Sequence, residues 1–166
     1  MTDVAPDVAG PVIGWRAWAV TREHGRHRLR SVVAPTVWEP GVALAARCLR
    51  PRFRPWRRHA APAESCECGI YAADLSGALE YARNAGGGYF SSMRVFGSVA
   101  LWGTVAEHEH GWRAEHAYPA EIVVPAAAFP RRRGPSTLAA VEHDLASYGV
   151  PLRISDDPAE LLELIA

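Results

Sequence analysis

The chain has 166 residues, 49% of them hydrophobic, and its formal net charge at pH 7 is zero. This length and composition suffice for one domain with a core, and the neutral charge excludes a globally basic surface for nucleic acid or membrane. All 18 basic residues are arginine, so a Walker phosphate loop, a protein-kinase active site, a pyridoxal Schiff base and a lysine nucleophile are excluded.

The first residues, 1–11, are acidic and rich in proline and glycine. They predict a flexible tail followed by a single α+β domain over 12–166. The tail lacks the basic start and apolar run of a signal peptide. No stretch of the chain approaches the roughly 18 uncharged apolar residues of a membrane span. We therefore expect a cytoplasmic protein with no membrane partner.

Seven segments carry the β-branched and aromatic residues that are typical of strands. We expect strands over 12–20, 27–33, 69–72, 94–105, 112–118, 121–124 and 152–154. The first two flank Gly25, which predicts a hairpin.

Helices are predicted by their caps. Asp74 can cap a helix that ends at the glycines of 86–88, and Ser136 can cap one over 137–148. A short terminal helix is expected over 156–165. Because strands and helices do not alternate regularly, the order favours an α+β fold with a mostly antiparallel sheet and two or three helices.

The segment from Leu49 to Glu67 is interrupted by three prolines, which argues against regular structure there. All three cysteines of the chain lie at or beside its ends. Three thiolates and one imidazole form a tetrahedral set that zinc accepts, and a bound ion supplies folding energy that such a loop lacks. The sequence therefore predicts a structural zinc site that pins an irregular loop, with ligands Cys48, His59, Cys66 and Cys68.

Two alternatives to this zinc site stay open. The thiols can be inert buried groups, or they can serve a redox or iron–sulfur role. If His59 is not the fourth ligand, His27, Glu64 or Glu67 can replace it. A closed set of four ligands is structural rather than catalytic.

An arginine-rich stretch overlaps the loop, since residues 47–58 read RCLRPRFRPWRR and contain no acid. Guanidinium forks match phosphates, and aromatic rings stack on bases. We therefore expect the 47–58 loop to contact a protein or nucleic-acid partner, the alternative being a solvated charged loop. The predicted contact residues are Arg50, Arg52, Arg54, Trp56, Arg57 and Arg58.

The densest set of titratable groups lies over 107–116, EHEHGWRAEH. On a strand, His108 and His110 would share one face and Glu107 and Glu109 the other. That arrangement suits an acid–base pair or an open metal site. The polar tip of a β-hairpin explains the same charges, and we favour that interpretation.

Two resemblances accompany these motifs. The segments GWRAW, CECGIYAA and LWGTVAEHEHGWRAEHAYP resemble those of a set of small uncharacterised bacterial proteins, over roughly residues 12–125. A second, weaker likeness is to ADP-ribosyltransferases. In these enzymes a Gly-Ile-Tyr strand precedes a helix, as at 69–71 here. An arginine, a serine pair and a Glu-x-Glu follow the order of Arg16, 91–92 and 107–109.

The second resemblance implies a catalytic cleft for NAD formed by Arg16, Tyr71 and Glu109. Arg16 would contact the phosphates and Glu109 would stabilise a ribosyl cation. The leading hypothesis is instead a non-enzymatic, zinc-stabilised binding or adaptor module. The module predicts no pocket at the 107–116 turn, whereas the enzyme predicts a cleft that joins Arg16 to Glu109.

Overall fold

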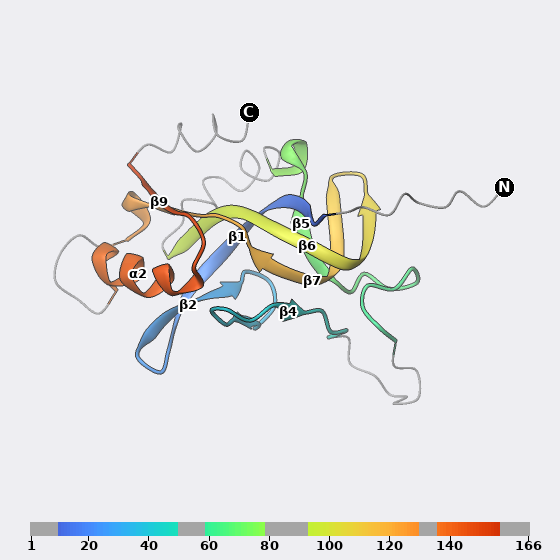
Figure 1. Ribbon diagram of the computed structural model, residues 1–166, viewed down its shortest axis with the longest axis horizontal. Helices are drawn as coiled ribbons and strands as arrows, with labels where there is room; N and C mark the ends of the chain where they lie inside the picture. Colours follow the sequence, from blue (N-terminus) through green and yellow to red (C-terminus); the bar gives the residue numbers. More distant parts are fainter. Residues whose placement is uncertain (1–9, 50–58, 79–92, 130–135, 157–166) are drawn as a thin grey trace.

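The structure is a computed structural model that describes residues 10–49, 59–78, 93–129 and 136–156. These residues form a nine-stranded, mostly antiparallel mixed sheet with one complete α-helix (Figure 1). The predicted α+β class is confirmed. Most of the predicted tail, the predicted terminal helix and the glycines of 86–88 lie outside the described residues. Among the described residues, no helix is long and apolar enough to cross a membrane.

The strands follow the predicted order, with two short additions at 37–38 and 44–45. They are β1 (Val12–Glu23), β2 (Arg26–Ser31), β3 (Val37–Trp38), β4 (Leu44–Ala45), β5 (Ile70–Ala73), β6 (Arg94–His108), β7 (Gly111–Pro119), β8 (Ile122–Pro125) and β9 (Leu152–Ser155). The helices are η3 (Ala126–Ala128), α2 (Leu138–Leu145) and η4 (Ala146–Tyr148). Residues 75–78 are also helical, and Asp74 caps them by accepting a hydrogen bond from Gly77 N at 2.6 Å, as predicted.

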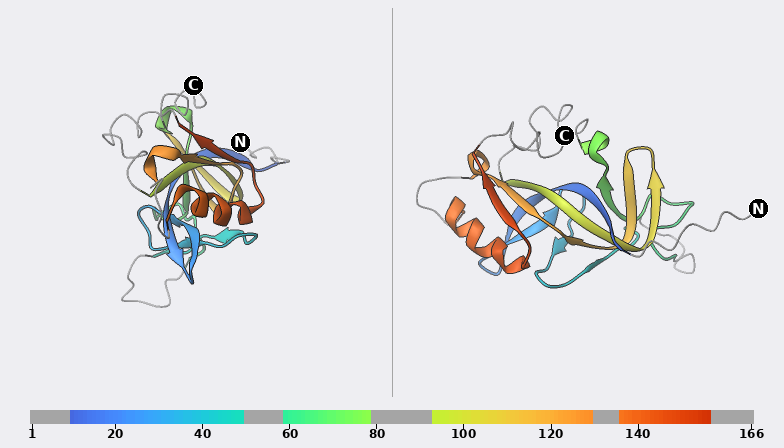
Figure 2. Two further views of the ribbon diagram at one scale, coloured as in Figure 1. Left: turned by 90° about the vertical axis from the view of Figure 1, so that its left-hand side faces the viewer. Right: turned by 45° about the horizontal axis from the view of Figure 1, so that its top comes forward.

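The sheet curls until four of its strands form a closed circuit. Strand β1 pairs antiparallel with β6 along Val12–Ala19, β6 pairs with β7, β7 with β5, and β5 returns to β1 at Trp15. Strands β2 and β3 extend the sheet from β1, and β8 and β9 extend it from β6. In Figure 1 and in the right-hand view of Figure 2, α2 and the tip of the β6–β7 hairpin lie at opposite ends of the molecule.

The predicted first hairpin is confirmed, with a two-residue turn between Glu23 and Arg26. Both turn residues have positive φ, 48° at His24 and 80° at Gly25. This is the conformation that a type I′ turn requires, and it matches the right-handed twist of the flanking strands.

The main core lies between the sheet and α2. Its fully buried members come from β1, β2, β3, β6, β7, β8 and α2; the largest are Trp18, Leu29, Trp38, Val95, Leu101, Ile122 and Leu145. Trp18 packs edge-on against Trp38 with ring centroids 5.7 Å apart. Tyr148 adds a polar tie, because its hydroxyl accepts from Leu29 N at 2.9 Å and donates to Trp38 O. The strand positions of Trp15, Trp18, Trp102 and Trp112 predict core residues, but Trp102 is instead 37% exposed.

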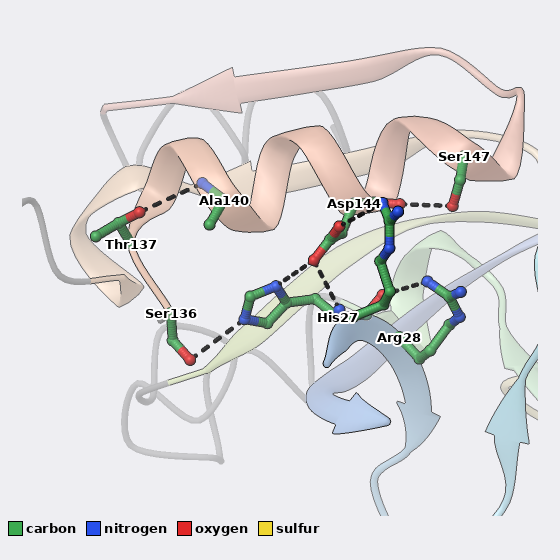
Figure 3. A network of polar contacts seen from close by, with 8 residues as sticks. His27, Arg28, Ser136, Thr137, Ala140, Asp144 and Ser147 are labelled. Atoms are coloured by element: carbon green, nitrogen blue, oxygen red, sulfur yellow. Dashed lines mark hydrogen bonds and ion pairs between the residues drawn. The ribbon is translucent and has the colours of Figure 1, made fainter. Parts of the chain in front are cut away.

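A buried polar network fastens the β1–β2 hairpin to α2 (Figure 3). The Asp144 carboxylate accepts from His27 N at 2.8 Å and lies 2.6 Å from the His27 Nδ1 atom. The other ring nitrogen, Nε2, lies 3.2 Å from Ser136 Oγ. Ser136 is therefore not the helix cap that the sequence predicted. Thr137 takes that role, because its hydroxyl accepts from Ala140 N at 3.3 Å.

The order Ser136–His27–Asp144 is also that of a hydrolytic triad. A triad histidine must contact both its nucleophile and the leaving group. His27 is 1% exposed, which leaves no room for a leaving group at its ring. The network is therefore structural.

Changing Asp144 to Asn should lower the free energy of unfolding at pH 7 by about 2 kcal/mol, because a buried charged network loses its centre. Burial opposes ionisation of Asp144, but hydrogen bonds from His27 and Arg26 outweigh it and lower the pKa of the carboxyl group. The ionised form therefore stabilises the fold above the unfolded pKa of about 3.9, and the gain is lost as pH falls through the lower folded pKa.

Urea unfolding between pH 2 and pH 7 should show the wild type losing its advantage over Asp144→Asn below about pH 4. Glu142→Gln, an exposed change on the same helix, is the matched control, and its free energy of unfolding should stay within about 0.5 kcal/mol of the wild-type value. A pH-independent difference between wild type and Asp144→Asn would contradict the assignment.

Candidate metal centre

Four potential ligands converge where β4 and β5 meet β7. Cys48 follows β4, and Cys66 and Cys68 directly precede β5. The ligand atoms of Cys48, His59, Cys66 and Cys68 all lie within 4.8 Å of one another, so this Cys3His cluster can hold a metal ion. The cluster contains the four residues that the spacing predicted.

The distances in the Cys3His cluster fit a tetrahedral ion. Two thiolates at about 2.3 Å from one zinc ion lie about 3.8 Å apart, and a thiolate and an imidazole nitrogen lie about 3.6 Å apart. The Sγ atoms of Cys48 and Cys66 are separated by 3.8 Å, and His59 Nε2 lies 3.2 Å from Cys68 Sγ. A disulfide would need about 2 Å between sulfurs, and none of the three cysteines forms one.

The thiols of the cluster crowd one another. Burial raises the pKa of the Cys68 thiol, and its hydrogen bond with Cys66 and the nearby sulfur charges raise it further. A cation among the sulfurs reverses this effect, since it stabilises thiolates. The donor set and its electrostatics thus agree with a bound cation.

Backbone contacts hold the two central thiols in place. Cys66 N donates to Ala63 O at 3.1 Å, which forms a tight turn before the ligands. The guanidinium of Arg113, on β7, donates through Nη1 to Cys66 O and, at 3.3 Å, to Cys68 O. Tyr71 donates its hydroxyl to Glu67 O at 2.7 Å. Arg113 and Tyr71 therefore tie residues 66–68 to the sheet, as outer groups orient ligands in metal sites.

The alternative fourth ligands do not join the cluster. His27 lies in the Asp144 network, next to α2. Glu64 and Glu67 are close to the cysteines in the sequence. Neither belongs to the ligand group, which among the described residues consists of His59 and the three cysteines. The predicted contact residues of the arginine loop, Arg50 to Arg58, lie outside the described residues. Its flanks, Arg47, Cys48 and Leu49, are described.

A cleft of about 960 Å³ adjoins the Cys3His cluster. It shares Cys48 and Cys68 with the cluster, so one wall of the cleft is also one side of the metal centre. We name it the Arg16 cleft. Its described polar and aromatic lining comprises Trp15, Arg16, Ser31, Arg47, Glu67, Tyr71, His108 and His110.

The charged turn over 107–116 is the tip of the β6–β7 hairpin, in which His108 pairs with Gly111. Gly111 has a φ of 147°, and a side chain there would collide with the Ala72 backbone oxygen, so glycine lets the tip press against β5. His108 and His110 line the cleft. The absence of a pocket at this turn, which the module hypothesis predicted, is therefore wrong.

The residues of the enzyme hypothesis are only partly brought together. Arg16 and Tyr71 share the cleft, and the Arg16 Nη1 atom donates to Tyr71 O. The side chain of Glu109 is 88% exposed and lies 3.8 Å from His110 Nε2. It is not among the described residues that line the cleft, where Glu67 is the single acid.

Sequence reasoning missed two contributors, Ser31 and Arg113. Ser31 accepts a hydrogen bond from Arg16 Nη2 at 3.1 Å, and Arg113 supports the thiols. Neither had a local motif, because each acts through pairing between distant strands.

No protein-family model matches the chain, and no curated protein or solved structure shows significant similarity to it.

Changing Arg113 to Met keeps the aliphatic stem but removes both hydrogen bonds to the thiol turn. We expect metal affinity to fall by about 10-fold, the lower end of what outer-shell groups contribute. Competition with a chromophoric chelator measures it. Arg153→Met removes an arginine that pairs with Glu121 on the far edge of the sheet, and should leave the affinity unchanged. Equal affinities in both variants would show that Arg113 does not orient the ligands.

Proposed function

We propose that the protein is a non-enzymatic binding module in which a structural zinc ion presents an arginine-rich loop to a nucleic acid. The observation that carries the proposal is the Cys3His cluster, whose ligand atoms lie within 4.8 Å of one another. Three sulfurs and one nitrogen are a donor set that zinc prefers among the common metals. Four protein ligands leave no open coordination position, which supports a structural role.

The placement of the ligands in the sequence links the ion to the loop. Cys48 and His59 stand on either side of ten residues, five of them arginine. Closing the cluster brings the two ends of this segment together and shortens the range of conformations open to it. A metal ion that restricts this segment would concentrate the charge of its arginines, and concentrated charge binds phosphates more strongly than dispersed charge.

Single-stranded nucleic acid suits this loop best. Phe53 and Trp56 interleave with the arginines, and aromatic stacking favours unpaired bases. Proteins with acidic surfaces are the other partner class, and they would use the charges without the rings.

The ADP-ribosyltransferase hypothesis has weaker support. Arg16 and Tyr71 share a cleft, but the Glu109 carboxylate on which the chemistry depends faces solvent. A carboxylate that stabilises a ribosyl cation has to reach the reacting carbon. We therefore do not adopt an enzymatic function.

The purified protein should contain about one zinc ion per chain, measured by elemental mass spectrometry. Cys66→Ser/Cys68→Ser should lose the ion, and chelation of the wild type should lower its thermal midpoint by several degrees because binding energy is folding energy. His143→Gln, at an exposed histidine of α2, is the control and should keep both. Iron and acid-labile sulfide in place of zinc, or a metal-free protein, would refute the zinc assignment.

Fluorescence anisotropy with a labelled single-stranded oligonucleotide tests the partner. Replacing Arg50, Arg52 and Arg54 by Gln should weaken binding about 10-fold at low salt and reduce the salt dependence by about three charges. The control replaces Arg22, Arg30 and Arg153, which removes equal charge from β1, β2 and β9. Equal loss in both triple variants, or binding of the wild type too weak to detect, would exclude the loop as a nucleic-acid site while leaving the zinc assignment intact.

A further inference from the structure

The charged side chain of Arg16 lies at the floor of the Arg16 cleft, and the register of β1 places it there. Gly14 and Trp18, two residues to either side of Arg16 on β1, are both buried. Because side chains alternate along a strand, Arg16 points to the same core-facing side as they do. Its guanidinium carbon lies 5.2 Å from the ring centroid of the buried Trp38, so a charge stands where a hydrophobic residue is the rule.

No carboxylate among the described residues pairs with Arg16. Its two Nη atoms donate to neutral oxygens, the Tyr71 carbonyl and the Ser31 hydroxyl. Burial lowers the pKa of Arg16 to about 10, the direction expected when a charge is removed from water without a counter-ion. An anion bound in the cleft would compensate the buried positive charge of Arg16.

Two buried donors at this floor also lack an acceptor. The Arg16 Nε atom is buried and makes no hydrogen bond. Ser31 Oγ accepts from Arg16 Nη2 at 3.1 Å and from Trp38 Nε1 at 3.0 Å. These two bonds occupy both lone pairs of the hydroxyl oxygen, so its own hydrogen is left to donate. Buried donors are nearly always paired, and an acceptor bound beside Arg16 and Ser31 would satisfy them.

We propose that the Arg16 cleft binds a small aromatic carboxylate, with the carboxylate on Arg16 and Ser31. This site goes beyond the proposed nucleic-acid contact and does not depend on it. A carboxylate offers a single charge and two acceptor oxygens in one plane, which matches one uncompensated guanidinium. A phosphate dianion carries a larger desolvation cost than a carboxylate when it is buried beside one guanidinium.

The residues that line the cleft above Arg16 favour a ligand in which the carboxylate is attached to a flat, apolar ring. The rings of Tyr71 and His108 lie 5.5 Å apart at 56° and both line the cleft. Val33 and Leu49, which are also in the lining, are 99% and 64% exposed, so apolar surface continues to the rim. A ring seated against these groups covers apolar area that otherwise faces water.

Benzoate is the probe, with benzamide as its uncharged isostere and phenyl phosphate as the phosphate alternative. Titration of the full-length zinc-loaded protein is followed by the Arg16 Nε–H and Trp38 indole N–H signals in ¹H–¹⁵N NMR spectra. For so small a ligand we expect a benzoate Kd on the order of 1 mM and at least 10-fold weaker binding of benzamide. Arg16→Gln should abolish saturable binding, whereas Arg22→Gln, on the exposed part of the same strand, should not change it.

A second pair of variants tests the site without disturbing the core. Val33 is 99% exposed, so Val33→Glu and Val33→Arg should fold equally well. The acidic variant should weaken benzoate binding about 3-fold in 20 mM salt and the basic variant should strengthen it by a similar factor, with both effects fading in 0.5 M salt. Benzamide binding as tightly as benzoate, tighter binding of phenyl phosphate, identical affinities in the two Val33 variants, or no saturable shift at 20 mM benzoate would each overturn the proposal.

Discussion

The antiparallel pairing of β1 with β6 is the constraint on which the remaining structure depends. Eight consecutive residues of β1 match Arg94–Leu101, and this register decides which side chains of β1 face the core. It buries Trp18 against Trp38 and at the same time turns Arg16 inward. A slip of one residue would exchange the two faces. The hydrophobic core and the charged floor of the cleft are therefore products of one register.

The Cys3His cluster and the Arg16 cleft share a wall, so the geometry of the cluster and the shape of the cleft depend on the same residues. Cys48 and Cys68 contribute to both, and residues 66–68 are held from behind by Arg113. A bound ion that fixes these residues also fixes the shape of the cleft beside them.

Local patterns sufficed for seven of the nine strands, the Gly25 hairpin and the ligand set, because alternation, turn chemistry and thiol spacing each depend on residues close together in the sequence. They missed the two-residue strands β3 and β4. They did not reveal the parallel pairing of β8 with β9, the closed strand circuit or the use of Ser136 beside His27. Those features depend on pairing between distant segments. Arg16 illustrates the difference between what the local sequence predicts and what only strand pairing determines. Its break in an apolar run was visible in the sequence, but its neutral partners, Ser31 and the Tyr71 carbonyl, come from other strands.

The closed circuit has a consequence for the order in which the chain assembles. The β1–β2 hairpin needs residues only as far as Ser31, but Val12 finds its partner in Leu101, 89 positions later (101 − 12). During synthesis, at about 5–20 residues per second, one edge of β1 therefore waits several seconds without its ladder. Closing so long a loop is also the slow part of folding for β-rich topologies. The nascent hairpin thus passes through a stage in which an apolar strand edge is open to other chains before β6 covers it.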